Sequence, residues 1–534
     1  MNKNGLIYDV EDKPKFSKLI VFALQQVLAI ITATIAVPTI IGLPTQIPAA
    51  ILGAGVGTIV YLLFTRFKSP VFLGSSFAFL NSLFVATTFG YCGILVGAIF
   101  AGLVYVVIAI VIHFAGTKWV SKLMPPVIIG PTVALIGLSL AGNAIGDLVK
   151  ASGFYAQEYA RVGGVEALIK NTATYNLVAL LCGLVAFAVI IICSSQKKFK
   201  SMKLIPFILG IAAGYAVASI FSIFGYACKC DYLKIVNWDP LVANFVQNGK
   251  FVGMTAFLNY PHFGLIEAIK EIAHKEAGIS GANLLNWAGV GEVAIAFIPV
   301  ALVVFAEHIA DHKNLSSIIG RDLVEGEPGL EKTLLGDGVG SIAGTIFGIC
   351  PNTTYGESVG CVAITKNASV RSILVAAIMC IVLSFLSPIM ALLQTIPNCV
   401  MGGVCLTLYG FIAVSGLKMF KEVDLGDNKN LFTVSAILIA GIGGLSVKIP
   451  YALNGDGSVA KTITITAIAT ALLLGIGVYA LMNFIEKKNA TIENADADEN
   501  APESLVAGAV APDASFELQG TEKEAAAEET TDKE

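Results

Sequence analysis

The stretch CPNTTYGES, Cys350 to Ser358, interrupts an otherwise apolar region of this chain. It contains a proline, a glycine and a carboxylate, Glu357, and all three are poor choices for a helix in lipid. Hydrocarbon offers no hydrogen bonds to unpaired backbone groups, so an irregular segment survives there only against protein or a water-filled cavity. The stretch therefore predicts a broken membrane helix beside a buried polar site.

The composition around this stretch is that of a polytopic membrane protein. Of 534 residues, 56% are hydrophobic and 13% are charged, whereas soluble proteins carry about 25% charged residues. So few charges cannot cover a water-soluble surface, and a soluble fold class is excluded. The ten cysteines show no paired metal spacing. Cys228 and Cys230 are expected to be free thiols in an outer loop, with a strained disulfide as the alternative.

Fourteen apolar runs are candidate membrane spans. They lie near 19–41, 49–65, 73–89, 92–114, 126–148, 173–193, 204–226, 286–311, 333–350, 351–366, 370–393, 398–418, 430–447 and 460–485. The third and tenth runs are short, polar and interrupted by glycine. We therefore predict an all-α polytopic membrane protein with short strand-like breaks in spans three and ten.

The placement of Lys and Arg indicates the orientation of the spans. With the N-terminal lysines in the cytoplasm, the basic loops at 66–68, 118–122 and 196–200 also fall on the cytoplasmic side. An even number of spans fits this alternation. We expect a multi-pass protein of the cytoplasmic membrane with both termini in the cytoplasm.

Seven spans precede residue 227 and seven follow residue 285, so the two halves must insert with opposite orientation. The predicted regions are a cytoplasmic N-terminus (1–18), a first seven-span repeat (19–226), an extracellular loop (227–285), a second seven-span repeat (286–485) and a disordered acidic cytoplasmic tail (486–534). The motif LGSSFAF (73–79) and CPNTTYGES each occupy the third span of their half. Interrupted segments at matched positions point to a transport site.

Each break is expected to lead into a half-helix whose free N–H groups point toward the middle of the bilayer. A kink packed against its neighbours is the alternative for one such segment taken by itself. Two matched segments favour a binding site, because paired helix N-termini would present donors to a carbonyl oxygen or an anion.

Acidic residues accompany the breaks. Glu307 and Asp311 lie at i and i+4 in VVFAEHIADHK and share a helix face. Charge at the bilayer centre costs about 3 kcal/mol, so these carboxylates and Glu357 should be paired, protonated or on a polar path. An interfacial position beside Lys313 is the alternative for Asp311, and His308 is expected to have a packing role.

Donor N–H groups beside carboxylates suit a small, flat, neutral ligand that alternates N–H and C=O groups. The carboxylates could also carry a proton. From the residues alone, the sequence therefore predicts a transporter for such a ligand.

Four segments resemble the uracil permease branch of the nucleobase–cation symporter family, which also includes xanthine permeases and nucleobase–ascorbate transporters. They are FLGSSFAF (72–79), FAEHIADHKNLSSIIGRDL (305–323), CPNTTYGESVGCVAITKNAS (350–369) and IPNCVMGGVCLTLYGFIAVSGLKM (396–419). The resemblance covers about residues 19 to 485. It implies two inverted seven-span repeats, with spans 1–4 and 8–11 as a core domain and the other spans as a gate domain.

The resemblance also implies the roles of particular residues. Glu307 and Glu357 would hold the polar edge of uracil, and the backbone at Phe77 and Gly356 would donate to ring oxygens. The other pocket residues would be Ser76, Tyr355, Ala33 and, from the gate, Tyr409. Proton coupling would involve Glu307, Asp311 and Glu357.

Two positions depart from the family pattern. Some uracil permeases carry a histidine where this chain has Asp311, and the motif often has asparagine where this chain has Ser358. The first departure leaves open whether Glu307 or Asp311 carries the proton. The second leaves the identity of the nucleobase more open.

The resemblance implies a transporter that moves uracil by proton symport, with the core moving against the gate, in a homodimer in the lipid membrane. We expect no enzyme activity, catalytic residue, metal, cofactor or nucleic-acid partner. The alternatives are a permease for xanthine, purines or another nucleobase, and an anion exchanger or channel with the same seven-plus-seven plan. A membrane enzyme is disfavoured because no metal-ligand or nucleophile–base spacing lies within the spans.

Overall fold

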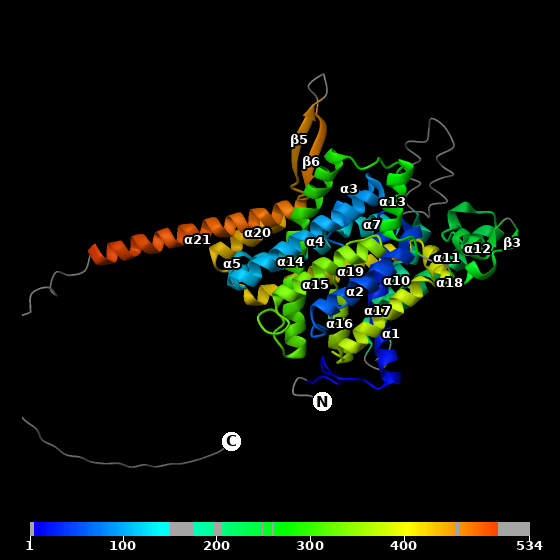
Figure 1. Ribbon diagram of the computed structural model, residues 1–534, viewed down its shortest axis with the longest axis horizontal. Helices are drawn as coiled ribbons and strands as arrows, with labels where there is room; N and C mark the ends of the chain where they lie inside the picture. Colours follow the sequence, from blue (N-terminus) through cyan, green and yellow to red (C-terminus); the bar gives the residue numbers. More distant parts are fainter. Residues whose placement is uncertain are drawn as a thin grey trace, which may run out of the picture. The chain divides into compact units, whose positions relative to one another are not determined.

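The structure is a computed structural model that describes residues 5–149, 176–196, 202, 205–247, 249–258, 261–453 and 459–499. Helices predominate throughout this part of the chain (Figure 1). The chain forms two compact units, which are Met1–Ala480 and Leu481–Glu534. Everything that positions the predicted site lies within the first unit.

The first half consists of helices with one short strand between them. Its elements are α1 (Phe16–Ile40), α2 (Ile47–Phe64), β1 (Leu73–Ser75), α3 (Leu80–Thr87), α4 (Gly90–Ala115), α5 (Lys118–Leu123), α6 (Pro126–Ser139), α7 (Ala141–Val149), α10 (Leu177–Ser195) and α11 (Pro206–Ala227). Between the halves lie α12 (Asp239–Phe245), β2 (Val246–Gln247), β3 (Lys250–Phe251) and α13 (Gly264–His274).

The second half repeats this pattern of helices around one short strand and adds a hairpin near its end. Its elements are α14 (Trp287–Ile319), α15 (Leu330–Phe347), β4 (Asn352–Thr354), α16 (Gly356–Thr365), α17 (Val370–Ser384), α18 (Ser387–Gln394), α19 (Asn398–Lys418), α20 (Asn428–Ile442), β5 (Val447–Leu453), β6 (Val459–Ile465) and α21 (Ala467–Glu499).

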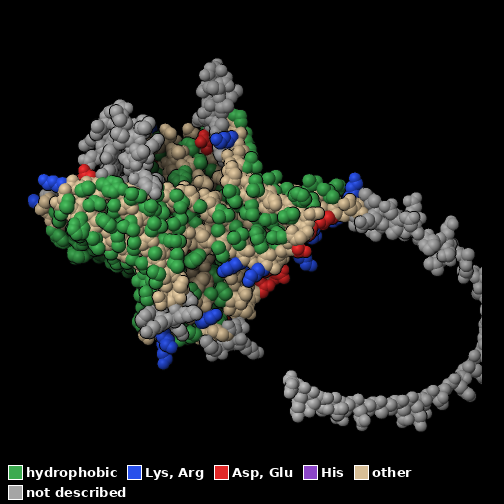
Figure 2. Space-filling view, turned by 180° about the vertical axis from the view of Figure 1, so that it is seen from behind, with side chains coloured by type: hydrophobic (Ala, Val, Ile, Leu, Met, Phe, Trp, Pro, Cys, Tyr) green, Lys and Arg blue, Asp and Glu red, His purple; other side chains and the backbone are tan. Residues whose placement is uncertain are grey.

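Nine helices of the described residues are long and apolar enough to cross a membrane, and two shorter ones are apolar. On the face drawn in Figure 2, apolar side chains cover a broad area and most charged side chains lie toward its margins. The predicted breaks in the third and tenth runs are confirmed, since β1 and β4 lie there, followed by the short helices α3 and α16. These features are those of a multi-pass membrane protein.

Two predicted boundaries near the C-terminus are wrong. The run at 460–485 begins as strand β6, because its alternating Thr and Ile residues are β-branched and favour extended chain. The hairpin of β5 and β6 was missed, although the sequence NGDG at 454–457 is a turn signal.

The predicted disordered tail is helical at its start, since α21 continues to Glu499 through residues rich in Ala, Glu and Lys. Residues 500–534 lie outside the described residues.

The predicted loop at 227–285 is partly organised. Glu271 of α13 is buried at the N-terminal end of α4, where its carboxylate accepts the backbone N–H groups of Tyr91 and Cys92, both at 2.9 Å. These N–H groups have no partner within their own helix, so the carboxylate acts as a cap. Cys228 and Cys230 are exposed free thiols, as expected.

Close glycine contacts join α2 to α15, helices from opposite halves. A β-carbon added at Gly57 would lie 2.7 Å from the carbonyl oxygen of Gly340, and one added at Gly340 would lie 2.8 Å from the carbonyl oxygen of Gly57. Small residues of this kind let helix backbones approach closely in lipid. α15 also packs against α4, and α2 against α17, so these helices form one tightly packed group.

A second group of helices packs around α19. Its neighbours are α6, α7 and α10, while α11 packs on α10 and α20 on α6. Contacts within each group are more extensive than contacts between the groups, where α14 meets α6 and α1 meets α11 and α19. The chain therefore has two helix groups, and both broken segments belong to the group around α2 and α15.

Replacing Gly340 by alanine should destabilise the protein, because the added methyl group would overlap the backbone of α2. We expect a loss of about 1–3 kcal/mol in the free energy of unfolding, measured by thermal unfolding in detergent. Gly410→Ala is the matched control, since a β-carbon there meets nothing within 4 Å. Equal unfolding midpoints for the two variants would contradict the close contact.

Candidate functional site

The two short strands pair with each other in the interior of the first unit. β1 and β4 are antiparallel, with Leu73 opposite Thr354 and Ser75 opposite Asn352. The pairing continues beyond the strands, since the Ser76 N–H donates to the carbonyl of Pro351 at 3.0 Å. Every residue of both strands is buried. The two breaks therefore satisfy each other's backbone groups where the helical hydrogen bonds stop.

The short helices that follow the strands begin beside this pairing. α16 starts at Gly356, so the N–H groups of its first turn have no partner within the helix. Gly356 is exposed and Glu357 is half-buried, although Tyr355 and Ser358 on either side are buried. The start of α16 thus borders an accessible space, as a binding site requires.

On the other side, β1 ends at Ser75 and α3 starts at Leu80. The carbonyl of Phe77 accepts the Leu80 N–H at 3.1 Å, so residues 77–80 form the turn that enters the helix. Ser76 is fully buried and Phe77 is 5% exposed. The backbone at Phe77 is therefore close to a helix start without being part of the helix.

The predicted acidic residues meet at the start of α16. Asp311 is 6% exposed and accepts the Thr354 hydroxyl at 3.1 Å. A β-carbon added at Gly356 would lie 3.5 Å from the Asp311 carboxylate. Asp311 is therefore buried against the strand, whereas Lys313 on the same helix is exposed.

Glu307, one helical turn before Asp311, is half-buried. Its Oε2 atom is buried and has no hydrogen-bond partner among the residues that the structure describes. Glu307 and Asp311 are one turn apart on α14, and Glu357 follows Gly356, which lies beside the Asp311 carboxylate. The three carboxylates predicted from the sequence therefore lie near the start of α16, and one of them offers an unused acceptor.

Tyr355, one of the predicted pocket residues, is hydrogen-bonded to the opposite strand. Its hydroxyl donates to the carbonyl oxygen of Ser75 at 2.8 Å, and its ring covers Gly74. The side chain therefore ties β4 to β1, which leaves its hydroxyl less available for a ligand.

The other two predicted pocket residues come from separate helices. The ring of Tyr409, on α19, meets the ring of Phe77 edge to face at a centroid distance of 5.4 Å. This contact joins the two helix groups next to the site. Ala33 is fully buried on α1, a helix that packs against β1 and α16.

Asp337 was missed by the sequence analysis. It is fully buried on α15 and accepts from His308 Nδ1 at 2.7 Å through Oδ2, while its Oδ1 has no hydrogen-bond partner among the described residues. His308, for which a packing role was expected, is fully buried, and both of its ring nitrogens have polar partners, the second being Thr333 Oγ1 at 3.0 Å. An acid inside the apolar run at 333–350 was the available signal.

His312 continues this polar network along α14. Its Nδ1 lies 2.8 Å from the carbonyl oxygen of His308 and must donate, since a carbonyl only accepts. Its Nε2 is 2.8 Å from the Tyr61 hydroxyl, which is 2.7 Å from Ser69 Oγ. The imidazole therefore accepts from Tyr61 when neutral, and the network links α14 to the end of α2.

Ser358, where the family motif often has asparagine, also has defined partners. Its hydroxyl oxygen accepts the Phe72 N–H at 3.0 Å and is hydrogen-bonded by the Gln26 amide. Ser358 therefore holds α16 to α1 and to the entry of β1, and it faces away from an open ligand space.

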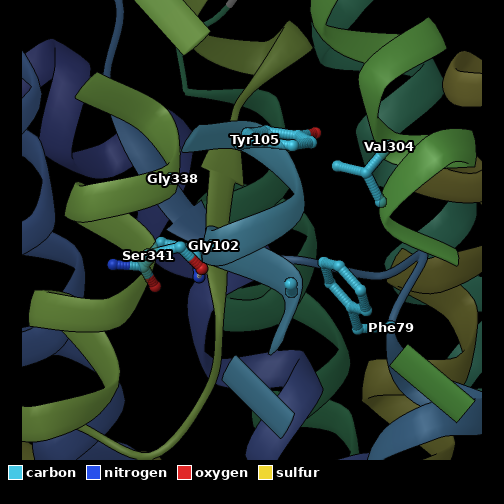
Figure 3. A pocket seen from close by; sticks show the side chains of 8 residues that line it. Phe79, Gly102, Tyr105, Val304, Gly338 and Ser341 are labelled. Carbon is cyan, nitrogen blue, oxygen red and sulfur yellow. Dashed lines mark hydrogen bonds between the residues drawn. The ribbon is translucent and has the colours of Figure 1, made fainter. Parts of the chain in front are cut away.

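A small pocket lies beside Asn352 of β4, with room for about one water molecule. Figure 3 shows the side chains around it. The lining residues are Phe79, Ala101, Gly102, Tyr105, Val304, Gly338, Ser341 and Asn352. The space is too small for a pyrimidine ring, so we regard it as a packing gap next to the site. Over the described ranges, no group of three or more His, Cys, Asp and Glu side chains is arranged to hold a metal ion.

Two solved structures with the same fold are titled as transporters of anions. The transmembrane domain of the cyanobacterial bicarbonate transporter BicA matches with a TM-score of 0.52 at 15% identity, covering 88% of this chain and all of that one. Murine Slc26a9, an anion transporter in the inward-facing state, matches with a TM-score of 0.53 at 11% identity, covering 89% of this chain and 69% of that one. Identities this low show the fold alone.

Sequence relatives carry a more specific name. The uracil permease of Bacillus caldolyticus is 34% identical over 485 residues, which cover 90% of this chain and 95% of that protein. The uracil permease of Escherichia coli (strain K12) is 30% identical over 497 residues, covering 92% and 97%. These relatives are permeases, not enzymes. The sequence profile of the xanthine and uracil Permease family matches residues 17–449. The chain therefore belongs to this permease family, in its uracil permease branch.

Proposed function

We propose that the protein imports uracil across the cytoplasmic membrane by proton symport. The observation that supports this proposal is that Glu307, Asp311 and Glu357 lie near the exposed start of α16, beside the paired strands. The names of the relatives support the substrate class. Uracil has two ring N–H groups and two carbonyl oxygens, which suit an acidic and a donor surface respectively.

In the proposed binding mode, Glu307 and Glu357 accept the ring N–H groups of uracil. The backbone N–H groups at Gly356 and Phe77 donate to its carbonyl oxygens. The unused Oε2 of Glu307 supports this role, because a buried acceptor without a partner costs about 1–3 kcal/mol. A ligand N–H would remove that cost.

The same carboxylates are the proposed proton carriers. In the described part of the chain, Asp337 is paired with His308, while no salt bridge joins Glu307, Asp311 or Glu357 to a basic side chain. Like charges in a low-dielectric site repel, and a proton on one of them relieves the repulsion. A proton that enters with uracil would therefore favour the loaded state.

The two helix groups are the proposed moving parts. The group around α2 and α15 would be the core that carries the site, and the group around α19 would be the gate. The Phe77–Tyr409 ring contact supports this division, because it is a limited contact between the groups at the site. Fourteen spans in two inverted repeats, cytoplasmic termini and a homodimer belong to the same proposal.

Anion exchange is the rival suggested by the fold. The carboxylates at the site argue against it, since an anion would face like charge there. Uptake of labelled uracil in proteoliposomes, with xanthine, thymine and bicarbonate as competitors, separates the candidates. If xanthine inhibited uptake and unlabelled uracil did not, xanthine would be the substrate. A saturable flux of bicarbonate would show that the protein is an anion exchanger instead.

Glu307→Gln and Glu357→Gln should each abolish uracil uptake, with a loss of about tenfold or more, because an amide replaces a charged acceptor with a weaker one. Uptake is normalised to folded protein in the membrane. Glu327→Gln is the matched control, since Glu327 pairs with Lys68 on the surface. Normal transport by either site variant would remove that residue from the mechanism.

Uptake should fall as external pH rises, because fewer protons are then available to load the outward-facing site. Replacing sodium by choline at constant pH should change little. The measurement is initial uptake in proteoliposomes with an imposed pH gradient. A sodium requirement at fixed pH would exclude proton symport.

Asp337→Leu should lower the free energy of unfolding by about 1–3 kcal/mol, because His308 loses its acceptor in a buried position. Asp337→Asn keeps an acceptor oxygen and should cost less. Thermal unfolding in detergent, together with uptake, measures both effects. A leucine variant as stable as the parent would show that the pair is dispensable.

A further inference from the structure

The hydroxyl groups of Thr58 and Ser341 hold the two strands in the same way. Leu73, the first residue of β1, donates its backbone N–H to Thr58 Oγ1 at 2.9 Å. Asn352, the first residue of β4, donates its backbone N–H to Ser341 Oγ at 3.0 Å. Both bonds are buried. In each half, the helix that precedes the broken segment supplies the acceptor.

Thr58 and Ser341 also occupy the same position in their helices. α2 and α15 each contain 18 residues. Thr58 and Ser341 are each the twelfth residue, counted from Ile47 and from Leu330. The matched positions fit two halves built on one plan, although the strand sequences differ.

The two hydroxyls lie at the tightest part of the helix pair. The residues just before them, Gly57 and Gly340, make the reciprocal backbone contact between α2 and α15. The Asn352 side chain adds a further tie, since its amide donates to the carbonyl oxygen of Gly53 at 2.8 Å. Ser341 lies beside β4 in the close-up (Figure 3). Both strands are therefore fastened to one rigid pair of helices.

The strands lead directly to the groups that would donate to the substrate. β1 ends at Ser75, shortly before Phe77, and β4 ends at Thr354, shortly before Gly356. Misplacing a binding group by about 1 Å is enough to weaken function strongly. The hydrogen bonds of Thr58 and Ser341 at the start of each strand therefore influence where both donors lie.

We propose that Thr58 and Ser341 are positioning residues that set the place of the Phe77 and Gly356 donors relative to each other. This inference rests on the proposed function for its kinetic readout. Its structural readout, the order of the two strands, does not depend on which substrate is carried.

The kinetic test uses the full-length protein in proteoliposomes with labelled uracil. Thr58→Val keeps the shape and removes the hydroxyl, so the KM for uracil should rise about threefold to tenfold, as expected for one buried hydrogen bond. The maximal rate per folded transporter should change little. Thr58→Ser retains the hydroxyl and should restore the KM. Ser341→Ala and Ser341→Thr form the same pair in the other half.

The matched control is Thr132→Val on α6. Thr132 is also fully buried, and its hydroxyl donates to the Ile128 carbonyl at 2.7 Å, just as Thr58 donates to the Ala54 carbonyl at 2.7 Å. This control loses the same intrahelical bond on a helix that carries neither strand, so its KM should stay at the parent value. A Thr58→Val KM equal to that of the control would overturn the proposal.

Hydrogen–deuterium exchange of peptides covering 71–79 and 350–358 gives the second readout. Both should exchange faster in Thr58→Val and Ser341→Ala than in Thr132→Val. Unchanged exchange would overturn the positioning role whatever the substrate. Faster exchange in a protein whose parent form takes up no uracil would support positioning while refuting the proposed function.

Discussion

The pairing of β1 with β4 is the interaction on which the rest of the site depends. The residues of both strands are buried, and each strand supplies hydrogen-bond partners for the backbone of the other. Neither break would be tolerated without the other. The pairing of the strands joins the two halves of the chain at one point. The helices α3 and α16 begin shortly after the two strands.

Buried charge is concentrated around the same point. Asp311 accepts from Thr354, the last residue of β4, and Asp337 is paired with His308. Glu307 and Glu357 are half-buried, and Glu357 lies in the first turn of α16. The two aspartates are therefore held by polar partners within the protein, whereas the two glutamates are more accessible. A site built in this way keeps polar groups for a ligand without leaving the strand itself unsupported.

The two departures from the family pattern become intelligible in this setting. Asp311 replaces a histidine found in some uracil permeases, and it finds a partner in the Thr354 hydroxyl. Histidine is still present on α14, since His308 and His312 stack with ring centroids 4.0 Å apart and reach α15 and α2. The hydroxyl oxygen of Ser358 accepts hydrogen bonds from the Phe72 N–H and from the Gln26 amide. At both positions, the residue of this chain therefore makes polar contacts to the strands or to the chain that enters them.

Sequence alone determined that this is a membrane protein with two broken segments and acids between them. Those conclusions follow from the cost of charge and unpaired backbone in lipid, which Pro351, Gly356, Glu307 and Glu357 reveal without any neighbour. The family followed from the motifs that carry these residues. Hairpin β5–β6 and the importance of Asp337 were also signalled in the sequence, by its turn residues and by an acid in an apolar run, and were overlooked.

Only the tertiary structure decided which groups satisfy one another. Local pattern could not show that Tyr355 binds Ser75, that Thr354 binds Asp311, or that Thr58 and Ser341 anchor the strands. Each of these bonds joins separate elements, over sequence separations from 11 residues for Ser341 and Asn352 to 280 for Ser75 and Tyr355. The reason is physical: a sequence records where polar groups must find partners in lipid, but the partners are set by how the helices pack.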